Sequence, residues 1–289
     1  MKKALMFLAY LLVSASIVSA FSLDSMIQNQ VGEMMKGEAA QSQENKCDVE
    51  TTVIEEDPAI DLATLSQQVD VSALLGKIKT QAAKIKTQYA EYEIKAKIMG
   101  FEKTMLGRSW TKLPNMSRFE VYEPADMAST TINNGFKSVY IDKDGKVKNL
   151  DKRQQASSSY QTDYGMFLDD FDIALAGGTR NVVHLMAAAK PDTSFSEMPI
   201  SSLIFIVDRT SNLIIGYDMK YKDMDMVAHS DISYDTDDNG ILYVSKVVMT
   251  MQPPNSAGMP DMLKSTFTMV TTKVMLNGAM SEDYFAIPE

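Results

Sequence analysis

The sequence predicts an α+β fold, with one large, strongly curved antiparallel sheet of about eleven strands and helices covering its concave face. Residues 61–89 place apolar side chains at steps of three and four, which is typical of an amphipathic helix. From about residue 88 the period changes to two, and short alternating segments are separated by turn residues. This order of elements favours an antiparallel meander over a parallel α/β sheet, in which strands and helices would alternate.

Compact turns separate the expected strands. Asn133-Asn134-Gly135 and Lys143-Asp144-Gly145 combine residues that accept positive φ, as do Asp208–Asn212 and Asp235–Gly240. After the strand that starts near residue 88, the expected strands are 106–112, 117–122, 130–132, 137–141, 147–150, 182–187, 201–207, 213–221, 224–234, 241–251 and 264–275.

Residues 164–176 are apolar on more than one side and are followed by Gly177-Gly178, a typical helix stop. We expect a short second helix here, inserted against the sheet as a lid. Its candidate lid residues are Phe167, Leu168, Phe171 and Leu175.

The first residues have the pattern of a secretory signal peptide. Lys2 and Lys3 precede an apolar run, which closes on the small residues Val18-Ser19-Ala20. We expect cleavage after Ala20 and a periplasmic mature protein, in which residues 21–60 form an acidic, flexible arm and residues 61–289 form one domain.

Charge and composition exclude several function classes. The formal net charge is −10, and removing Lys2 and Lys3 brings it to −12, which argues against nucleic acid as a partner. A single cysteine, Cys47, excludes an internal disulfide framework and a Cys-rich zinc site, and two histidines leave little room for His-based catalysis or a His-rich metal centre. No nucleophile–base pair is recognisable, so we expect a protein that is not an enzyme and has no cofactor. Asp235–Gly240 resembles the start of an EF-hand loop, but Lys246 stands where that loop needs a glutamate.

The 22 methionines are the unusual feature of the composition. Met224 and Met226 share one face of an expected strand, and so do Met249 and Met251. Flexible thioethers suit a core or a lipid cavity, which is the favoured interpretation. With His229 nearby, a copper site is the alternative, because thioethers are soft ligands for Cu(I).

One stretch, Gly107-Arg108-Ser109-Trp110-Thr111-Lys112-Leu113-Pro114-Asn115, followed by an aromatic strand and Glu123-Pro124, carries a family resemblance. Together with the C-terminal Asn277-Gly278 and Tyr284-Phe285-Ala286-Ile287-Pro288, it resembles the LolA/LolB-type lipoprotein localisation factors and their outer-membrane lipoprotein-sorting superfamily. The resemblance covers about residues 62–288 and marks the chain as a divergent member.

The resemblance implies a half-barrel whose cavity holds the acyl chains of lipidated proteins or lipids, with a membrane protein of the envelope as a candidate partner. One departure stands out. The family's Lys-x-Pro-Asn motif has an arginine before the proline that ties the lid shut, and here that residue is Leu113. Arg108 is an unaligned candidate substitute.

Strand parity and the resemblance together define the candidate ligand-cavity residues. These are Trp110, Phe119, Val121, Phe136, Tyr140, Phe205, Met224, Met226, Met249 and Met251. Two alternatives stay open: an envelope sensor or protein-binding scaffold on the same fold, and an ordinary closed sandwich with no cavity.

Overall fold

The computed structural model describes residues 58–98, 101–150, 168–191, 193, 196, 200–222, 226–253 and 264–288. The expected signal peptide, residues 21–57 of the acidic arm with Cys47, Phe167, Met224 and most of the loop 253–261 lie outside these residues. In the described part of the chain, no helix is long and apolar enough to cross a membrane.

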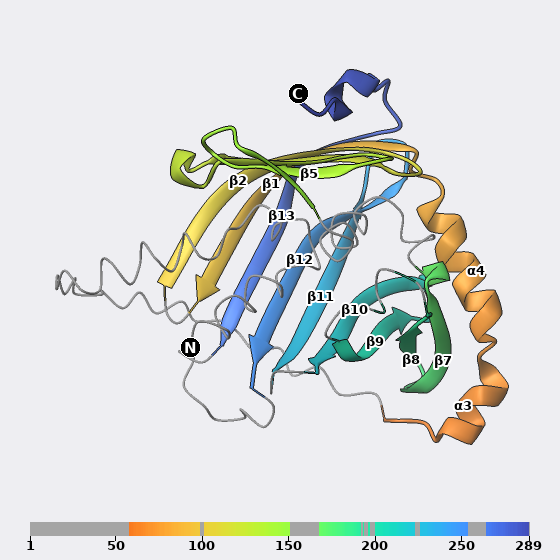
Figure 1. Cartoon of the computed structure of the whole chain (residues 1–289). Helices are drawn as coiled ribbons and strands as arrows, with labels where there is room; N and C mark the ends of the chain where they lie inside the picture. The colour runs from red at the N-terminus through yellow and green to blue at the C-terminus, as the bar shows by residue number, and fades with distance from the viewer. Residues whose placement is uncertain are drawn as a thin grey trace.

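The described strands form one antiparallel sheet in the order β6-β5-β4-β3-β2-β1-β13-β12-β11-β10-β9-β8-β7 (Figure 1). Their bounds are β1 Thr87–Ile98, β2 Phe101–Lys112, β3 Met116–Glu123, β4 Ser129–Asn134, β5 Ser138–Ile141, β6 Val147–Asn149, β7 Phe171–Gly178, β8 Val182–Ala189, β9 Ile200–Asp208, β10 Leu213–Tyr221, β11 Val227–Thr236, β12 Leu242–Gln252 and β13 Ser265–Leu276.

The predicted meander is confirmed, but its size and curvature differ from the prediction. Among the described residues the sheet has thirteen strands, and β6 and β7 stand at its two ends. This order leaves the sheet open. The sheet is also not strongly curled (Figure 1), whereas a half-barrel of about eleven strands was predicted. The first and last strands, β1 and β13, pair in its middle and join two meanders into one sheet.

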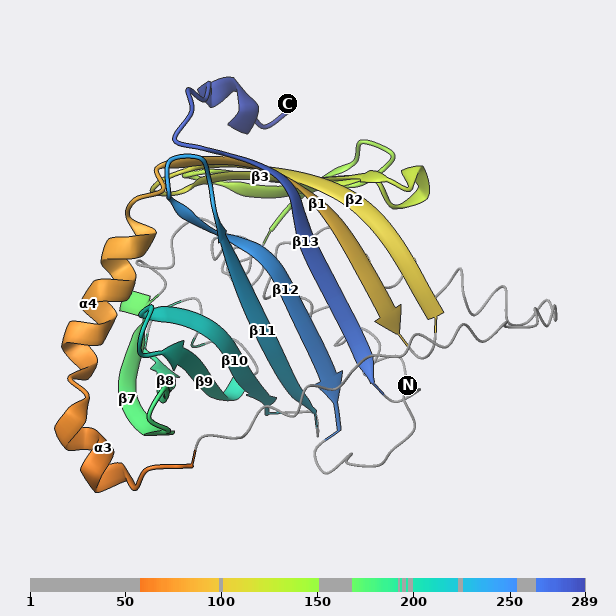
Figure 2. The same cartoon turned by 180° about the vertical axis from the view of Figure 1, so that it is seen from behind.

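Two helices replace the single long helix predicted over residues 61–89. α3 spans Leu62–Gln68 and α4 spans Val71–Ala82. Asp61 and Asp70 cap their N-termini by accepting hydrogen bonds from Thr64 N and Ala73 N, at 2.9 and 3.0 Å. The second cap explains the break between the helices. Both helices lie beside the β7 end of the sheet in either view (Figures 1 and 2), rather than over its whole face.

The second predicted helix is wrong from Phe171 onward: Leu168 and Asp169 are helical, but residues 171–176 belong to β7. Phe171 is buried and Ile173 and Leu175 are half-buried, whereas the residues between them are exposed. That alternation has the period of a strand. β7 pairs with β8 along its length: Phe171 is opposed to Ala189 at one end and Gly178 to Val183 at the other. The lid residues Phe171 and Leu175 are thus part of the sheet, whereas Leu168, also buried, is helical and lies three residues before Phe171.

The main core lies on one face of the sheet, which we call the inner face. Ala90 of β1, Phe119 of β3, Phe205 of β9 and Met251 of β12 belong to it, and all are at most 3% exposed. Leu74 and Ile78 of α4 join the same cluster.

The opposite, outer face carries a smaller core. A short 3₁₀ helix, η4 (Glu282–Phe285), places Phe285 against Ile132 and Val139. The C-terminal segment therefore packs on the side of the sheet away from the main core (Figure 1).

Candidate functional site: the inner face of the sheet

The strand register aligns inner-face side chains into rows across the sheet. Directly opposed residues of antiparallel strands project to the same side, so each row can be followed from pair to pair. The row that we call the Ser230 row crosses eight strands through Ala96, Phe267, Met249, Ser230, Tyr217, Phe205, Leu185 and Leu175.

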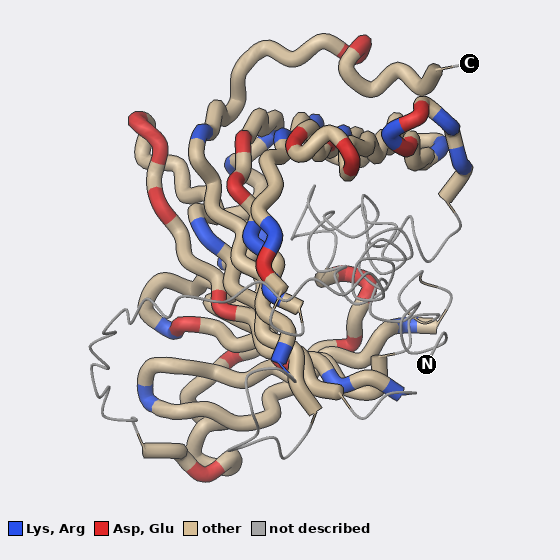
Figure 3. Tube along the Cα trace, turned by 90° about the vertical axis from the view of Figure 1, so that its left-hand side faces the viewer, with Lys and Arg blue, Asp and Glu red and all other residues tan. Residues whose placement is uncertain are grey.

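The neighbouring row, called the Met251 row, crosses seven strands through Ser265, Met251, Ala228, Met219, Leu203, Ala187 and Ile173. Neither row contains a charged residue, although 23% of the chain is charged. Figure 3 shows acidic and basic positions interspersed along the described strands. The two rows therefore form a continuous uncharged strip, chemically suited to apolar chains.

The inner face of β2–β5 is richer in hydroxyl groups. Tyr140 and Phe119 are both opposed to Thr131, so these three share the face. On β1 and β2, the hydroxyls of Tyr92 and Ser109 lie 2.9 Å apart and form a hydrogen bond. Burial raises the pKa of Tyr92 and of Tyr140, so both keep their protons at neutral pH.

Five of the candidate cavity residues lie together on the inner face as buried side chains. They are Phe119, Val121, Phe205, Met249 and Met251. Tyr140 shares the face and is half-buried, and Met226, just before β11, packs against the same cluster.

Two candidate residues lie elsewhere. Phe136 is 97% exposed in the turn between β4 and β5. Trp110 is opposed to Arg118, whereas the inner-face Phe119 is opposed to Ser109. Because neighbouring residues of a strand face opposite sides, Trp110 belongs to the outer face.

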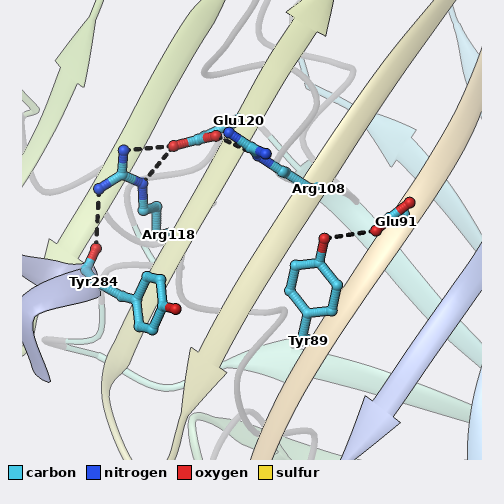
Figure 4. A network of polar contacts seen from close by, with 6 residues as sticks. All are labelled: Tyr89, Glu91, Arg108, Arg118, Glu120 and Tyr284. Carbon is cyan, nitrogen blue, oxygen red and sulfur yellow. Dashed lines mark hydrogen bonds and ion pairs between the residues drawn. The ribbon is translucent and has the colours of Figure 1, made fainter. Parts of the chain in front are cut away.

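Trp110 is the centre of an outer-face network. The guanidinium carbons of Arg108 and Arg118 lie 5.1 and 5.7 Å from the Trp110 ring centroid, and the ring of Tyr284 stacks on Trp110 at 5.6 Å. Glu120 is buried between the two arginines and accepts from each Nε at 2.6 Å (Figure 4).

Arg118 also donates to the carbonyl oxygen of Tyr284 at 3.1 Å, which ties the C-terminal segment to the sheet. Nearby, the Tyr89 hydroxyl donates a hydrogen bond to Glu91 at 2.7 Å. Burial is the larger cause and this hydrogen bond the second, and together they raise the pKa of Tyr89 to about 12. The contacts of Tyr284 with Trp110 and Arg118 therefore attach the C-terminal segment to the outer face.

The proposed substitute for the family's lid arginine does not reach the inner face. Arg108 lies on the outer face, held by Glu120 and by the Trp110 and Tyr122 rings. Leu113 lies in the turn after β2, where its N–H donates to the carbonyl of Lys86 at 2.8 Å. Neither residue is placed to lock a lid over the inner face.

The copper alternative conflicts with the geometry of β11 and β12. His229 is opposed to Thr250, so it lies on the outer face, whereas Met249 and Met251 lie on the inner face. Both imidazole nitrogens of His229 are within hydrogen-bond distance of carboxylates, Asp218 at 2.6 Å and Asp231 at 3.2 Å. These methionines and this histidine cannot ligate one ion.

Ser230 is a residue that the sequence analysis did not single out. Its side chain is 0% exposed, and among the described residues its Oγ has no hydrogen-bond partner. The period-two pattern of Ala228, Ser230 and Ile232 shows only that a hydroxyl interrupts an apolar face, because partners are not visible in a sequence.

No protein-family model matches the chain, and no curated protein matches it. Solved structures do. A DUF1329 family protein from Desulfovibrio piger has a TM-score of 0.59 at 15% identity, over 74% of this chain and 95% of that one. An outer membrane lipoprotein-sorting protein domain from Vibrio parahaemolyticus has a TM-score of 0.56 at 10% identity, over 74% of this chain and 94% of that one. A LolA superfamily protein from Nitrosomonas europaea has a TM-score of 0.56 at 12% identity, over 76% of this chain and 98% of that one. The resemblance inferred from the sequence is thus confirmed as a likeness of fold.

Proposed function

We propose that this protein is a non-enzymatic carrier of acyl chains, which binds lipids or lipidated proteins on the inner face of its sheet. The observation that supports this most directly is the uncharged strip formed by the Ser230 and Met251 rows. Burying an acyl chain contributes about 0.8 kcal/mol per methylene group, so such a strip can hold a long chain without any catalytic group.

The fold is consistent with this role, because one of the similar structures is an outer membrane lipoprotein-sorting protein domain. In this proposal a signal peptide is removed after Ala20, residues 21–60 form an arm, residues 61–289 are the carrier, and the protein acts in the periplasm. Leu74 and Ile78 of α4 pack in the inner-face cluster, so in this proposal α4 covers the β7 end of the strip.

The test combines native mass spectrometry with a binding assay on the full chain. Protein purified from the cell envelope is expected to carry lipid or a lipidated protein. It is also expected to bind the neutral fluorescent probe N-phenyl-1-naphthylamine. Met249→Gln buries an amide on the inner face and is expected to weaken probe binding about tenfold.

Val248 offers the matched control. It precedes Met249 on β12, is opposed to Asp231 and lies on the outer face. Val248→Gln is expected to leave probe affinity within about twofold, and thermal melting checks that both variants fold. An empty protein that ignores the probe would overturn the proposal. Recovery of one stoichiometric protein and no lipid would favour a scaffold on the same fold instead.

A further inference from the structure

The centre of the uncharged strip contains a polar atom whose environment is unusual. Ser230 stands between Tyr217 of β10 and Met249 of β12 in the Ser230 row. Its own-strand neighbours on the inner face are Ala228 and Ile232, which are both buried and apolar. Within the part of the chain that the structure describes, Ser230 Oγ has no hydrogen-bond partner.

A second buried hydroxyl, that of Tyr221 on the neighbouring strand β10, also lacks a good hydrogen-bond acceptor. Tyr221 is 7% exposed, and its hydroxyl donates to the thioether sulfur of Met219 at 3.9 Å. Thioether sulfur is a weak acceptor. Burial raises the pKa of Tyr221, so its hydroxyl stays protonated and remains a donor.

Buried hydroxyls without an oxygen or nitrogen partner are disfavoured, because removing them from water has a free-energy cost that nothing offsets. Native proteins contain few such groups. A ligand that supplies a hydrogen-bond acceptor would offset this free-energy cost. The inner face of β10 and β11 thus presents a donor to whatever lies on the strip.

We propose that Ser230 is a ligand-binding residue, whose hydroxyl donates to the uncharged carbonyl oxygen of an acyl ester or amide. This inference rests on the proposed acyl-binding function and adds the head chemistry of the ligand. A free fatty acid fits less well, because neither described row offers a cation to an ionised carboxylate. The acyl chain then extends along the flanking apolar positions, such as Met249 and Met251.

The test compares two ligands that differ at the carbonyl group. 1-Lauroylglycerol is an ester, and 1-O-dodecylglycerol is the ether with the same chain length and glycerol head. Affinities are measured by displacement of N-phenyl-1-naphthylamine below the critical micelle concentration. The wild-type chain is expected to prefer the ester about fivefold, and Ser230→Ala is expected to bind the two equally. Laurate, the carboxylate, is expected to bind more weakly than the ester.

Ser109→Ala is the matched control, because Ser109 is an inner-face serine whose hydroxyl is already bonded to Tyr92. It is expected to keep the ester preference. Equal wild-type affinity for ester and ether, an ester preference that survives in Ser230→Ala, or tighter binding of laurate would each overturn the inference while leaving acyl binding in place. Failure of the wild type to bind any of the three ligands would overturn the proposed function itself.

Discussion

His229 and Asp218 face each other across the β10–β11 pair, with imidazole Nδ1 2.6 Å from a carboxylate oxygen. Asp231 lies 3.2 Å from the other ring nitrogen. The hydrogen bond to Asp218 is the largest influence and raises the pKa of His229; partial burial opposes it. The protonated imidazolium is therefore favoured in the folded state on this outer surface.

This pair predicts a pH-dependent stability. A histidine whose folded-state pKa is raised contributes stability that is fully present below its unfolded pKa of about 6.5 and is lost as pH rises through the folded value. His229→Gln is therefore expected to destabilise the protein at pH 5.5, with a smaller effect at pH 8.5. Urea unfolding of both proteins across this range measures the difference. A difference that grows with pH would contradict the assignment.

Glu120 predicts a stability loss on the outer face. Its side chain is 9% exposed, and both Arg108 and Arg118 bond to it. Glu120→Gln removes the charge but keeps the shape, and is expected to lower the free energy of unfolding by about 1–2 kcal/mol, because the arginines are partly exposed and can rehydrate. The control is Glu93→Gln, which removes a surface pair with Lys95 and should change stability little in urea titrations.

Trp110 is the single tryptophan of the chain and reports on the C-terminal segment. The Tyr284 ring stacks on it with an interplanar angle of 17°. Tyr284→Ala is expected to shift Trp110 emission to longer wavelength, because the indole becomes more exposed to water. Tyr243→Ala, on β12, is expected to leave the spectrum unchanged. An unshifted spectrum in Tyr284→Ala would show that the segment does not cover Trp110.

Gly216 is required by a close backbone approach. A Cβ atom at this position would lie 2.4 Å from the backbone oxygen of Ser230, nearer than side-chain carbons come in proteins. Gly216→Ala must displace β10 or β11 and is expected to destabilise by about 1–3 kcal/mol. Gly76→Ala is the control: nothing lies within 4 Å of a Cβ on this α4 residue, and about 1 kcal/mol of stabilisation is expected. Thermal melting compares the two.

Ser230 makes a prediction for the ligand-free protein as well. Removing a hydroxyl that has no partner should not destabilise the fold, so Ser230→Ala is expected to match or exceed wild-type stability. Ser109→Ala, which removes the partner of the Tyr92 hydroxyl, is expected to lose about 1 kcal/mol. A large loss in Ser230→Ala, measured by urea unfolding of delipidated protein, would show that Ser230 has a structural partner.

Most strands were predictable because alternation and turn residues agree locally. The predicted segment Leu213–Tyr221 coincides with β10, and the Asp235–Gly240 turn is closed by Asp237, which accepts from Ile241 N at 2.7 Å. β7 was missed because Ala174 and Ala176 are strong helix formers in a short apolar run. Such runs do not distinguish a helix from a strand, and the pairing with β8 decides the outcome.

The inner face was predictable within a strand but not between strands. Alternation in β3 correctly separates Phe119 and Val121 from Arg118 and Glu120. The face of Trp110 depends on the register between β2 and β3, which the sequence of β2 alone does not contain. The unpartnered state of Ser230 likewise depends on which side chains three strands bring together.

The pairing of β1 with β13 has a consequence for how the chain folds. Lys273 contacts Glu91, which lies 182 residues away in the sequence, and the Asn277 side chain accepts a hydrogen bond from the N–H of Lys86, 191 residues away. The strand pairs on either side are local hairpins that can form early, but this central seam must await the last strand. Folding should therefore be slow and limited by closure of one long loop. A chain that stops before β13 would leave the exposed edge of β1 open to pairing with other molecules.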